Sequence, residues 1–103
     1  MAVCTIFDMP GVSQAQYEAV CRDLNHGKLL TSLSDWPGGG ILSHTSGPTP
    51  TGWRVIDVWE SEEDFRRFGE MLGPLMQKHG FPNIQPQVFP VHNLVNRGVG
   101  QTR

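Results

Sequence analysis

The chain has 103 residues, which is enough for one domain and too few for two of ordinary size. Hydrophobic residues (38%) and 12 glycines together reach the apolar share of globular domains, but charged residues make up only 17% against a usual ~25%. The net charge of −2 excludes the basic surface of proteins that bind nucleic acid or anionic membranes. No stretch approaches the ~20 apolar residues of a membrane span and no secretion signal is evident, so we expect a soluble cytoplasmic protein.

The N-terminal third predicts a strand followed by a helix. Ala2–Phe7 is short and rich in β-forming residues. Ser13 and Gln16 have the spacing of a capping box, which marks the start of a helix. The segment Tyr17–Leu24 then places apolar side chains at helical spacing, and Gly27 supplies the left-handed residue that ends the helix.

The middle of the chain predicts a hairpin. Ile41–Thr45 and Trp53–Trp59 are rich in β-forming residues, and the Pro- and Gly-containing segment Gly47–Gly52 lies between them. Two strands joined by so short a loop pair antiparallel.

The C-terminal third predicts a helix and a last strand. Ser61 begins the helix with acidic residues in its first turn, and Gly80 ends it. Pro74 removes a backbone donor inside this helix and is expected to kink or split it. Gln87–Leu94 is the last strand, and residues 96–103 form a tail.

The element order is therefore β-α-β-β-α-β. Two such halves form a four-stranded antiparallel sheet with both helices on one face, which is the ferredoxin-like α+β fold. We expect one domain over residues 1–95, followed by the tail at 96–103.

The missing charges are not spread evenly. Asp57–Glu70 holds eight charged residues, whereas Trp36–Trp53 and His79–Asn96 hold none. These two uncharged segments contain the second and fourth predicted strands, although the wet face of an antiparallel sheet is usually polar and often charged. We therefore expect the helices to cover one face and a second subunit to cover the other. The alternative is an exposed face that is polar but uncharged.

The usual motifs of catalytic and cofactor sites are absent from the sequence, which has no GxSxG, HExxH, GxxxxGK[ST] or GxGxxG. Cys4 and Cys21 are too few for a four-thiolate zinc site, and no two of the four histidines have metal-ligand spacing. We therefore expect neither a metal ion nor a cofactor.

Three residues in the predicted strands are candidate catalytic groups. His44 and His92 lie in strands that are otherwise free of charge, where a histidine is either a hydrogen-bonded core residue or an acid/base in a pocket. Asp57 interrupts an apolar strand, so it must be paired, exposed or functional. Strand parity places Arg54 on the opposite face from Asp57. A hydrogen bond at the sheet edge or at a subunit interface is the alternative role for Asp57.

Four further residues are candidates for lining a small-molecule pocket. Trp36 precedes a proline in a loop and suits the entrance of a pocket. Tyr17, Phe68 and Met76 would form its helical wall. Because they follow helical spacing, packing in the core is the default alternative for these three.

A family resemblance rests mainly on the stretch Gly52–Phe65, which reads GWRVIDVWESEEDF. In it a strand ends in Trp59, a capping box follows at Ser61–Asp64, and Phe65 is an aromatic residue of the second helix. The chain resembles the dimeric α/β-barrel superfamily, in the branch that contains the antibiotic-biosynthesis monooxygenases, over roughly residues 3–95. The motif indicates a fold rather than a reaction, because it is physically a strand end, a helix cap and a core aromatic.

The resemblance implies that two monomers pair sheet to sheet as a closed barrel, each with a pocket between its sheet and its helices. Such a dimer would cover the uncharged sheet face. Haem-degrading members of the superfamily carry an Asn on the first strand, a Trp within the second helix and a His near the end of that helix. Here Phe68 stands at the helix position, the first strand has no Asn, and only His79 lies near the expected His, which disfavours haem degradation.

We therefore expect a homodimeric, cofactor-independent enzyme that oxygenates or cyclises an aromatic or polyketide-like small molecule. His92 or His44 would remove a proton from a phenolic or enolic substrate. The anion that forms would be positioned or stabilised by Arg54, Asn93 or Asp57. The alternative is a non-catalytic small-molecule-binding or accessory protein on the same dimer. Neither interpretation involves nucleic acid or a membrane.

Overall fold

Four strands and two helices follow one another in the predicted order in the computed structural model, which describes residues 1–97. The predicted tail therefore lies mostly outside the described residues. The elements are β1 (Val3–Pro10), α1 (Gln14–Leu24), the short 3-10 helix η1 (Leu33–Asp35), β2 (Ile41–Pro48), β3 (Gly52–Trp59), α2 (Glu62–Lys78) and β4 (Gln87–Pro90).

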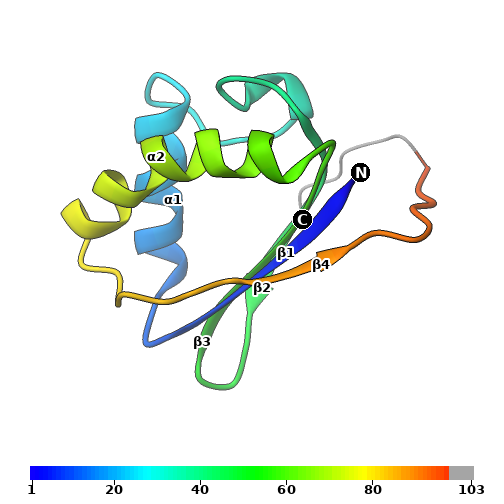
Figure 1. The fold of residues 1–103 in the computed structure, drawn as a ribbon. Coiled ribbons are helices and arrows are strands. Elements are labelled where there is room, and N and C mark those ends of the chain that lie inside the picture. Colours follow the sequence, from blue (N-terminus) through cyan, green and yellow to red (C-terminus); the bar gives the residue numbers. More distant parts are fainter. Residues whose placement is uncertain (98–103) are drawn as a thin grey trace.

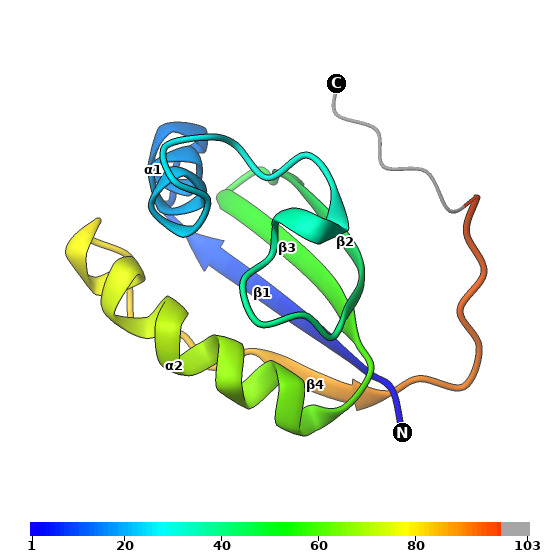
Figure 2. The ribbon, with the colours of Figure 1, turned by 90° about the horizontal axis from the view of Figure 1, so that it is seen from above.

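The strands form one sheet in the order β2-β3-β1-β4, and every neighbouring pair is antiparallel. Both helices lie on the same face of this sheet, and the loop that carries η1 lies on that side as well (Figures 1 and 2). The ferredoxin-like α+β fold predicted from the sequence is confirmed. The two uncharged strands, β2 and β4, are the two edges of the sheet.

The strand ends differ from the prediction in both directions. β1 continues beyond Phe7 to Pro10, which pairs with Gly52, and the chain turns at Gly11 with φ +76°. β4 stops at Pro90 instead of Leu94. Its pairing with β1 runs out there because β1 itself begins at Val3, and one further backbone bond joins the next residue to Ala2.

The expected split at Pro74 does not occur, since α2 is continuous from Glu62 to Lys78. Ser61 caps its first turn by accepting a hydrogen bond from the Asp64 backbone N–H at 3.1 Å. Proline removes only one backbone donor, close to the C-terminal end of the helix. The carbonyl that loses its partner belongs to the exposed Glu70, where water can replace the bond.

The two faces of the sheet are distinguished by alternate residues of the central strands. Along β1 the buried positions alternate with less buried ones. We call the helix-covered side the inner face; on β1 and β3 it is formed by Val3, Thr5, Phe7, Met9, Trp53, Val55, Asp57 and Trp59. The other side is the outer face, to which Cys4, Ile6, Asp8, Arg54 and Ile56 belong. Two apolar clusters between the inner face and the helices make up the core.

Candidate functional site

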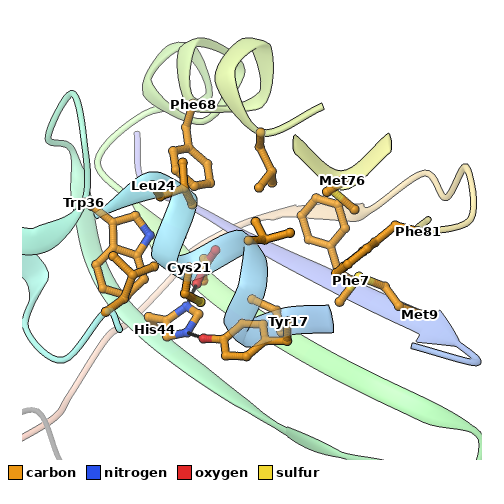
Figure 3. Close-up of a pocket in the computed structure, with 15 residues that line it drawn as sticks. Phe7, Met9, Tyr17, Cys21, Leu24, Trp36, His44, Phe68, Met76 and Phe81 are labelled. Atoms are coloured by element: carbon orange, nitrogen blue, oxygen red, sulfur yellow. Dashed lines mark hydrogen bonds and ion pairs between the residues drawn. The ribbon is translucent and has the colours of Figure 1, made fainter. Parts of the chain in front are cut away.

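A small cavity lies between the inner face and the two helices, with a volume of about 50 Å³ (Figure 3). Because one water occupies about 10–15 Å³ on this scale, the cavity holds a few water molecules and is well below the size of a drug-sized ligand site. Most of the side chains around it are aromatic or aliphatic. The polar exceptions are Tyr17, Cys21, His44 and Asp57.

A chain of two short hydrogen bonds joins three of these polar residues. Tyr17 Oη lies 2.6 Å from His44 Nε2, and His44 Nδ1 lies 2.5 Å from Asp57 Oδ1. A carboxylate only accepts hydrogen bonds, so the Nδ1–H of His44 donates to Asp57. In the neutral imidazole, Nε2 is then the free acceptor and takes a hydrogen bond from the Tyr17 hydroxyl. The imidazole is thus held between a carboxylate that accepts a hydrogen bond from Nδ1–H and a hydroxyl that donates one to Nε2.

The register of the β2–β3 hairpin creates the His44–Asp57 pair. His44 and Asp57 stand directly opposite each other in the antiparallel ladder, where side chains on the same face come within contact distance. Tyr17 approaches from the first turn of α1, which the Ser13–Gln16 capping box fixes. The site therefore depends on the position of one hairpin turn and one helix cap.

Burial controls the protonation of this chain. Asp57 is only 4% exposed, and burial raises the pKa of its carboxyl group, while the hydrogen bond and charge of His44 act in the opposite direction. Burial also raises the pKa of the Tyr17 hydroxyl far above its ordinary value, so this group keeps its proton at neutral pH. A proton can be exchanged along such a chain without leaving an unpaired charge in the apolar cavity.

Two aromatic rings contact the imidazole. The Trp36 ring packs on His44 with centroids 4.6 Å apart and the planes tilted by 57°. The Tyr17 ring is nearly parallel to the imidazole, at 8° and 6.2 Å, and also contacts Trp53. In Figure 3, Trp36, His44 and Tyr17 lie at one end of the cavity, and Phe7 and Phe81 lie at the other. The polar end of the cavity is therefore held rigidly, whereas the rest is hydrocarbon.

The structure brings together six of the residues singled out from the sequence. Those that line the cavity are Tyr17, Trp36, His44, Asp57, Phe68 and Met76. Three others lie elsewhere. Arg54 is on the outer face, where its guanidinium donates to the Asp8 carboxylate at 2.6 and 3.2 Å. His92 and Asn93 are exposed beyond the end of β4, because the strand stops before it reaches them.

Sequence reasoning missed the partner of Asp57 and the place of Cys21. Strand parity excludes Arg54 as the partner of Asp57 but does not identify His44, whereas a hairpin register that pairs residues 48 and 53 also pairs His44 with Asp57. Cys21 lies on the apolar face of α1 together with Tyr17, and that helical spacing was the available signal for its place in the cavity. Burial raises the pKa of the Cys21 thiol, so this side chain lines the cavity as a neutral thiol.

Residues 1–97 contain no group of three or more His, Cys, Asp or Glu side chains that converge as metal ligands would. Within the same part of the chain, no helix combines the length and the apolar character needed to cross a membrane.

Comparison with known proteins supports the fold. No protein-family model matches the chain, and no curated protein matches it in sequence. Two solved structures of SnoaB, a cofactor-independent oxygenase from Streptomyces nogalater, resemble it. An alanine-substituted form has a TM-score of 0.56 and 16% identity over 91% of this chain and 94% of that chain. A second SnoaB structure has a TM-score of 0.53 and 15% identity over 91% and 93%.

A NIPSNAP-like domain protein from Burkholderia xenovorans is more distant, with a TM-score of 0.43 and 12% identity over 98% of this chain and 93% of that chain. The likeness to SnoaB confirms the fold that the resemblance to the antibiotic-biosynthesis-monooxygenase-like branch implied. Because the sequence identity is so low, the shared property is the fold itself.

Proposed function

We propose that the protein is an enzyme that removes a proton from a small aromatic or polyketide-like molecule, leading to cofactor-independent oxygenation or to cyclisation. The observation that carries this proposal is the hydrogen-bonded chain from Tyr17 through His44 to Asp57 at the end of an otherwise apolar cavity. A base oriented by a buried carboxylate and placed next to a hydroxyl is the arrangement that proton-transfer catalysis requires.

The proposed proton path follows the hydrogen bonds. A phenolic or enolic substrate gives its proton to Tyr17 Oη as the Tyr17 hydroxyl proton passes to His44 Nε2. Asp57 then faces an imidazolium, whose charge it balances at 2.5 Å. Neither Arg54, His92 nor Asn93 takes part in this path, because none of them lines the cavity.

The apolar lining supports a hydrophobic substrate. The electron-rich anion left by proton removal can react with dissolved O₂, which is the oxidant in oxygenation, or attack a carbonyl of the same molecule in cyclisation. Either reaction benefits from a cavity that excludes water. The cavity of about 50 Å³ must widen to admit such a substrate, and the unbranched Met76 side chain is the lining group best able to move.

The experiment compares three cavity variants with a matched surface control. A panel of phenolic and enolic polycyclic compounds is screened for oxygen uptake and for new product masses. We expect His44→Gln to lower turnover by about 10²-fold or more and Asp57→Asn and Tyr17→Phe to lower it as well. His79→Gln should have no effect, because His79 pairs with Asp23 outside the cavity. Wild-type turnover in His44→Gln would contradict the proposal.

A non-catalytic binding protein is the second candidate, and the mostly apolar lining of the cavity favours it. Tyr17 and His44 are hydrogen-bonded within the chain, so the cavity would hold an apolar ligand without reacting with it. In this case the protein would bind members of the panel, as seen by calorimetry, and return them unchanged. His44→Gln would then alter affinity without any turnover to lose.

We also propose that two copies pair through their outer faces. Ile6 and Ile56 lie there half-buried, and Phe89 of β4 is 47% exposed. The edge strands carry no formal charge, although charged side chains usually protect an exposed edge. Sedimentation should give a dimer that Ile56→Lys converts to a monomer, whereas Leu33→Lys, at an exposed position on η1, leaves it intact. A monomeric wild type would disprove this pairing.

A further inference from the structure

One polar row crosses the inner face of the sheet from strand to strand. His44 on β2 stands opposite Asp57 on β3, and Asp57 in turn stands opposite Thr5 on β1. The next position along, Val88 on β4, is apolar. Thr5 is completely buried, and its hydroxyl oxygen has no hydrogen-bond partner among residues 1–97. Such a group is unfavourable in a protein core, where a buried hydroxyl normally finds a partner.

Packing alone does not explain a threonine at this place. The other inner-face residues of β1 are Val3, Phe7 and Met9, all of them apolar. A valine has nearly the same shape as threonine and would fill the same space without burying a hydroxyl. The hydroxyl is therefore the feature that needs a reason, and the nearest position across the ladder holds the carboxylate of Asp57.

We propose that the Thr5 hydroxyl is a second donor to the Asp57 carboxylate and acts as a positioning residue for the Tyr17–His44–Asp57 chain. This inference rests on the proton-transfer role proposed above. His44 engages only Oδ1 of Asp57. Directly opposed residues of an antiparallel pair have Cβ atoms about 4.5–5.5 Å apart, so a change of the Thr5 rotamer turns its hydroxyl toward Oδ2. The bond is made directly or through one ordered water.

The second donor would have two effects. It fixes the plane of the carboxylate, and through it the direction in which the imidazole presents Nε2 to Tyr17. It also stabilises the ionised form of Asp57, which must persist while His44 carries the transferred proton.

The other titratable groups near Asp57 come from two further elements. α1 contributes Tyr17 and Cys21 to the cavity, and β1 contributes Cys4, whose thiol senses the Asp57 charge from the outer face. α2 contributes only Phe68, Leu72 and Met76 to the lining, none of which titrates. Apart from His44 and Tyr17, these neighbours are neutral thiols, so removal of the Thr5 hydroxyl should act mainly on the Asp57–His44 pair.

The test measures the protonation of His44 in the protein without any ligand. The ¹⁵N chemical shifts of its ring are followed against pH in Thr5→Val, Thr5→Ser and the wild type. Loss of the donor disfavours the state with ionised Asp57 and neutral His44, so the pair should hold its proton to higher pH. We expect Thr5→Val to raise the midpoint by about half a unit to one unit and Thr5→Ser to restore it.

Thr45→Val is the matched control, because it also replaces a threonine by a valine but does so on the outer face. There the Thr45 hydroxyl donates to the Ile56 carbonyl. Thr5→Ala supplies a second variant without the hydroxyl. An unchanged His44 midpoint in both Thr5→Val and Thr5→Ala would overturn the inference. The measurement needs no substrate, so a shifted midpoint in a protein that turns over none of the compounds would refute the proposed enzyme and leave the Thr5 contact standing.

Discussion

The inner and outer faces of the same sheet differ in which side chains they bury. On the inner face, Asp57 and Thr5 are polar and almost completely buried. On the outer face, the polar pair Asp8–Arg54 is about half exposed, while the apolar Phe89 is 47% exposed as well. A sheet built only for stability would bury apolar groups and expose polar ones.

Each face carries side chains in an environment that is unfavourable by itself. Buried polar groups are unfavourable unless they bond to one another, and the inner face meets this condition for His44 and Asp57 by cross-strand register. Exposed apolar groups are unfavourable unless something covers them, and the outer face carries Ile6, Ile56 and Phe89 partly exposed. The inner face thus buries a bonded polar pair, whereas the outer face presents apolar side chains to solvent.

The largest expected effect tests where the stability of one subunit resides. Trp59 is fully buried on the inner face, so Trp59→Ala should lower the free energy of unfolding by about 3–5 kcal/mol. Phe89→Ala should change it by about 0.5 kcal/mol at protein concentrations low enough to keep the chain monomeric. Urea denaturation followed by circular dichroism measures both.

The same pair of variants becomes more informative at high protein concentration. If two copies associate through the outer face, the Phe89→Ala loss grows with concentration, because dissociation is then coupled to unfolding. The difference in unfolding free energy between Trp59→Ala and the wild type should not change with protein concentration. Equal losses from the two substitutions in the monomer would show that the faces do not differ as described.

A smaller effect tests whether the polar row is held by mutual bonding. His44→Leu leaves the carboxyl of Asp57 buried without its partner and should cost about 1–3 kcal/mol of unfolding free energy. The double variant His44→Leu/Asp57→Leu places two apolar side chains opposite each other and should recover most of this loss. A double variant no more stable than His44→Leu would mean that the loss does not come from the unpaired Asp57 carboxyl.

The fold was largely predictable from the sequence, and the pair at the centre of the site was not. Hydrophobic periodicity and helix caps identify each strand and helix because they act locally. These local patterns do not determine the register of the β2–β3 hairpin, because the register depends on the turn. The expected loop Gly47–Gly52 would pair Ser46 with Trp53 and place His44 opposite Val55. The observed turn spans only residues 49–51, and this shift of two positions brings His44 to Asp57.

The candidate residues that lie outside the cavity do so for reasons that are equally local. His92 was assigned to a strand that in fact ends at Pro90, where the first strand has no more backbone to pair with. Arg54 and Asp57 are alternatives for holding the substrate anion, and because residues three apart on a strand lie on opposite faces, only one of them can face the helices. The cavity lining does include Tyr17, Phe68 and Met76, whose helical spacing marks the helix face that packs on the sheet. Trp36 reaches the cavity from the loop over the sheet.

The smallest effect concerns the acid range and compares a buried carboxyl with a surface one. Burial raises the pKa of Asp57, so its contribution favours folding below the ordinary pKa of 3.8 and is lost as pH rises through the folded value. Hydrogen bonds from His79 and Lys78 lower the pKa of Asp23. The Asp23 contribution is therefore present above pH 3.8 and is lost as pH falls through the folded value.

Asp57→Asn and Asp23→Asn should consequently change the pH dependence of stability in opposite directions. Between pH 5 and pH 3, acidification should improve the wild type relative to Asp57→Asn and weaken it relative to Asp23→Asn. Urea unfolding at half-unit steps measures both differences, and this range stays below the ordinary histidine pKa of ~6.5. Parallel profiles for the two variants would mean that the inner face does not shield Asp57 from solvent. Opposite slopes would mean that one domain holds two carboxyl groups whose protonation is governed by burial in one case and by surface partners in the other.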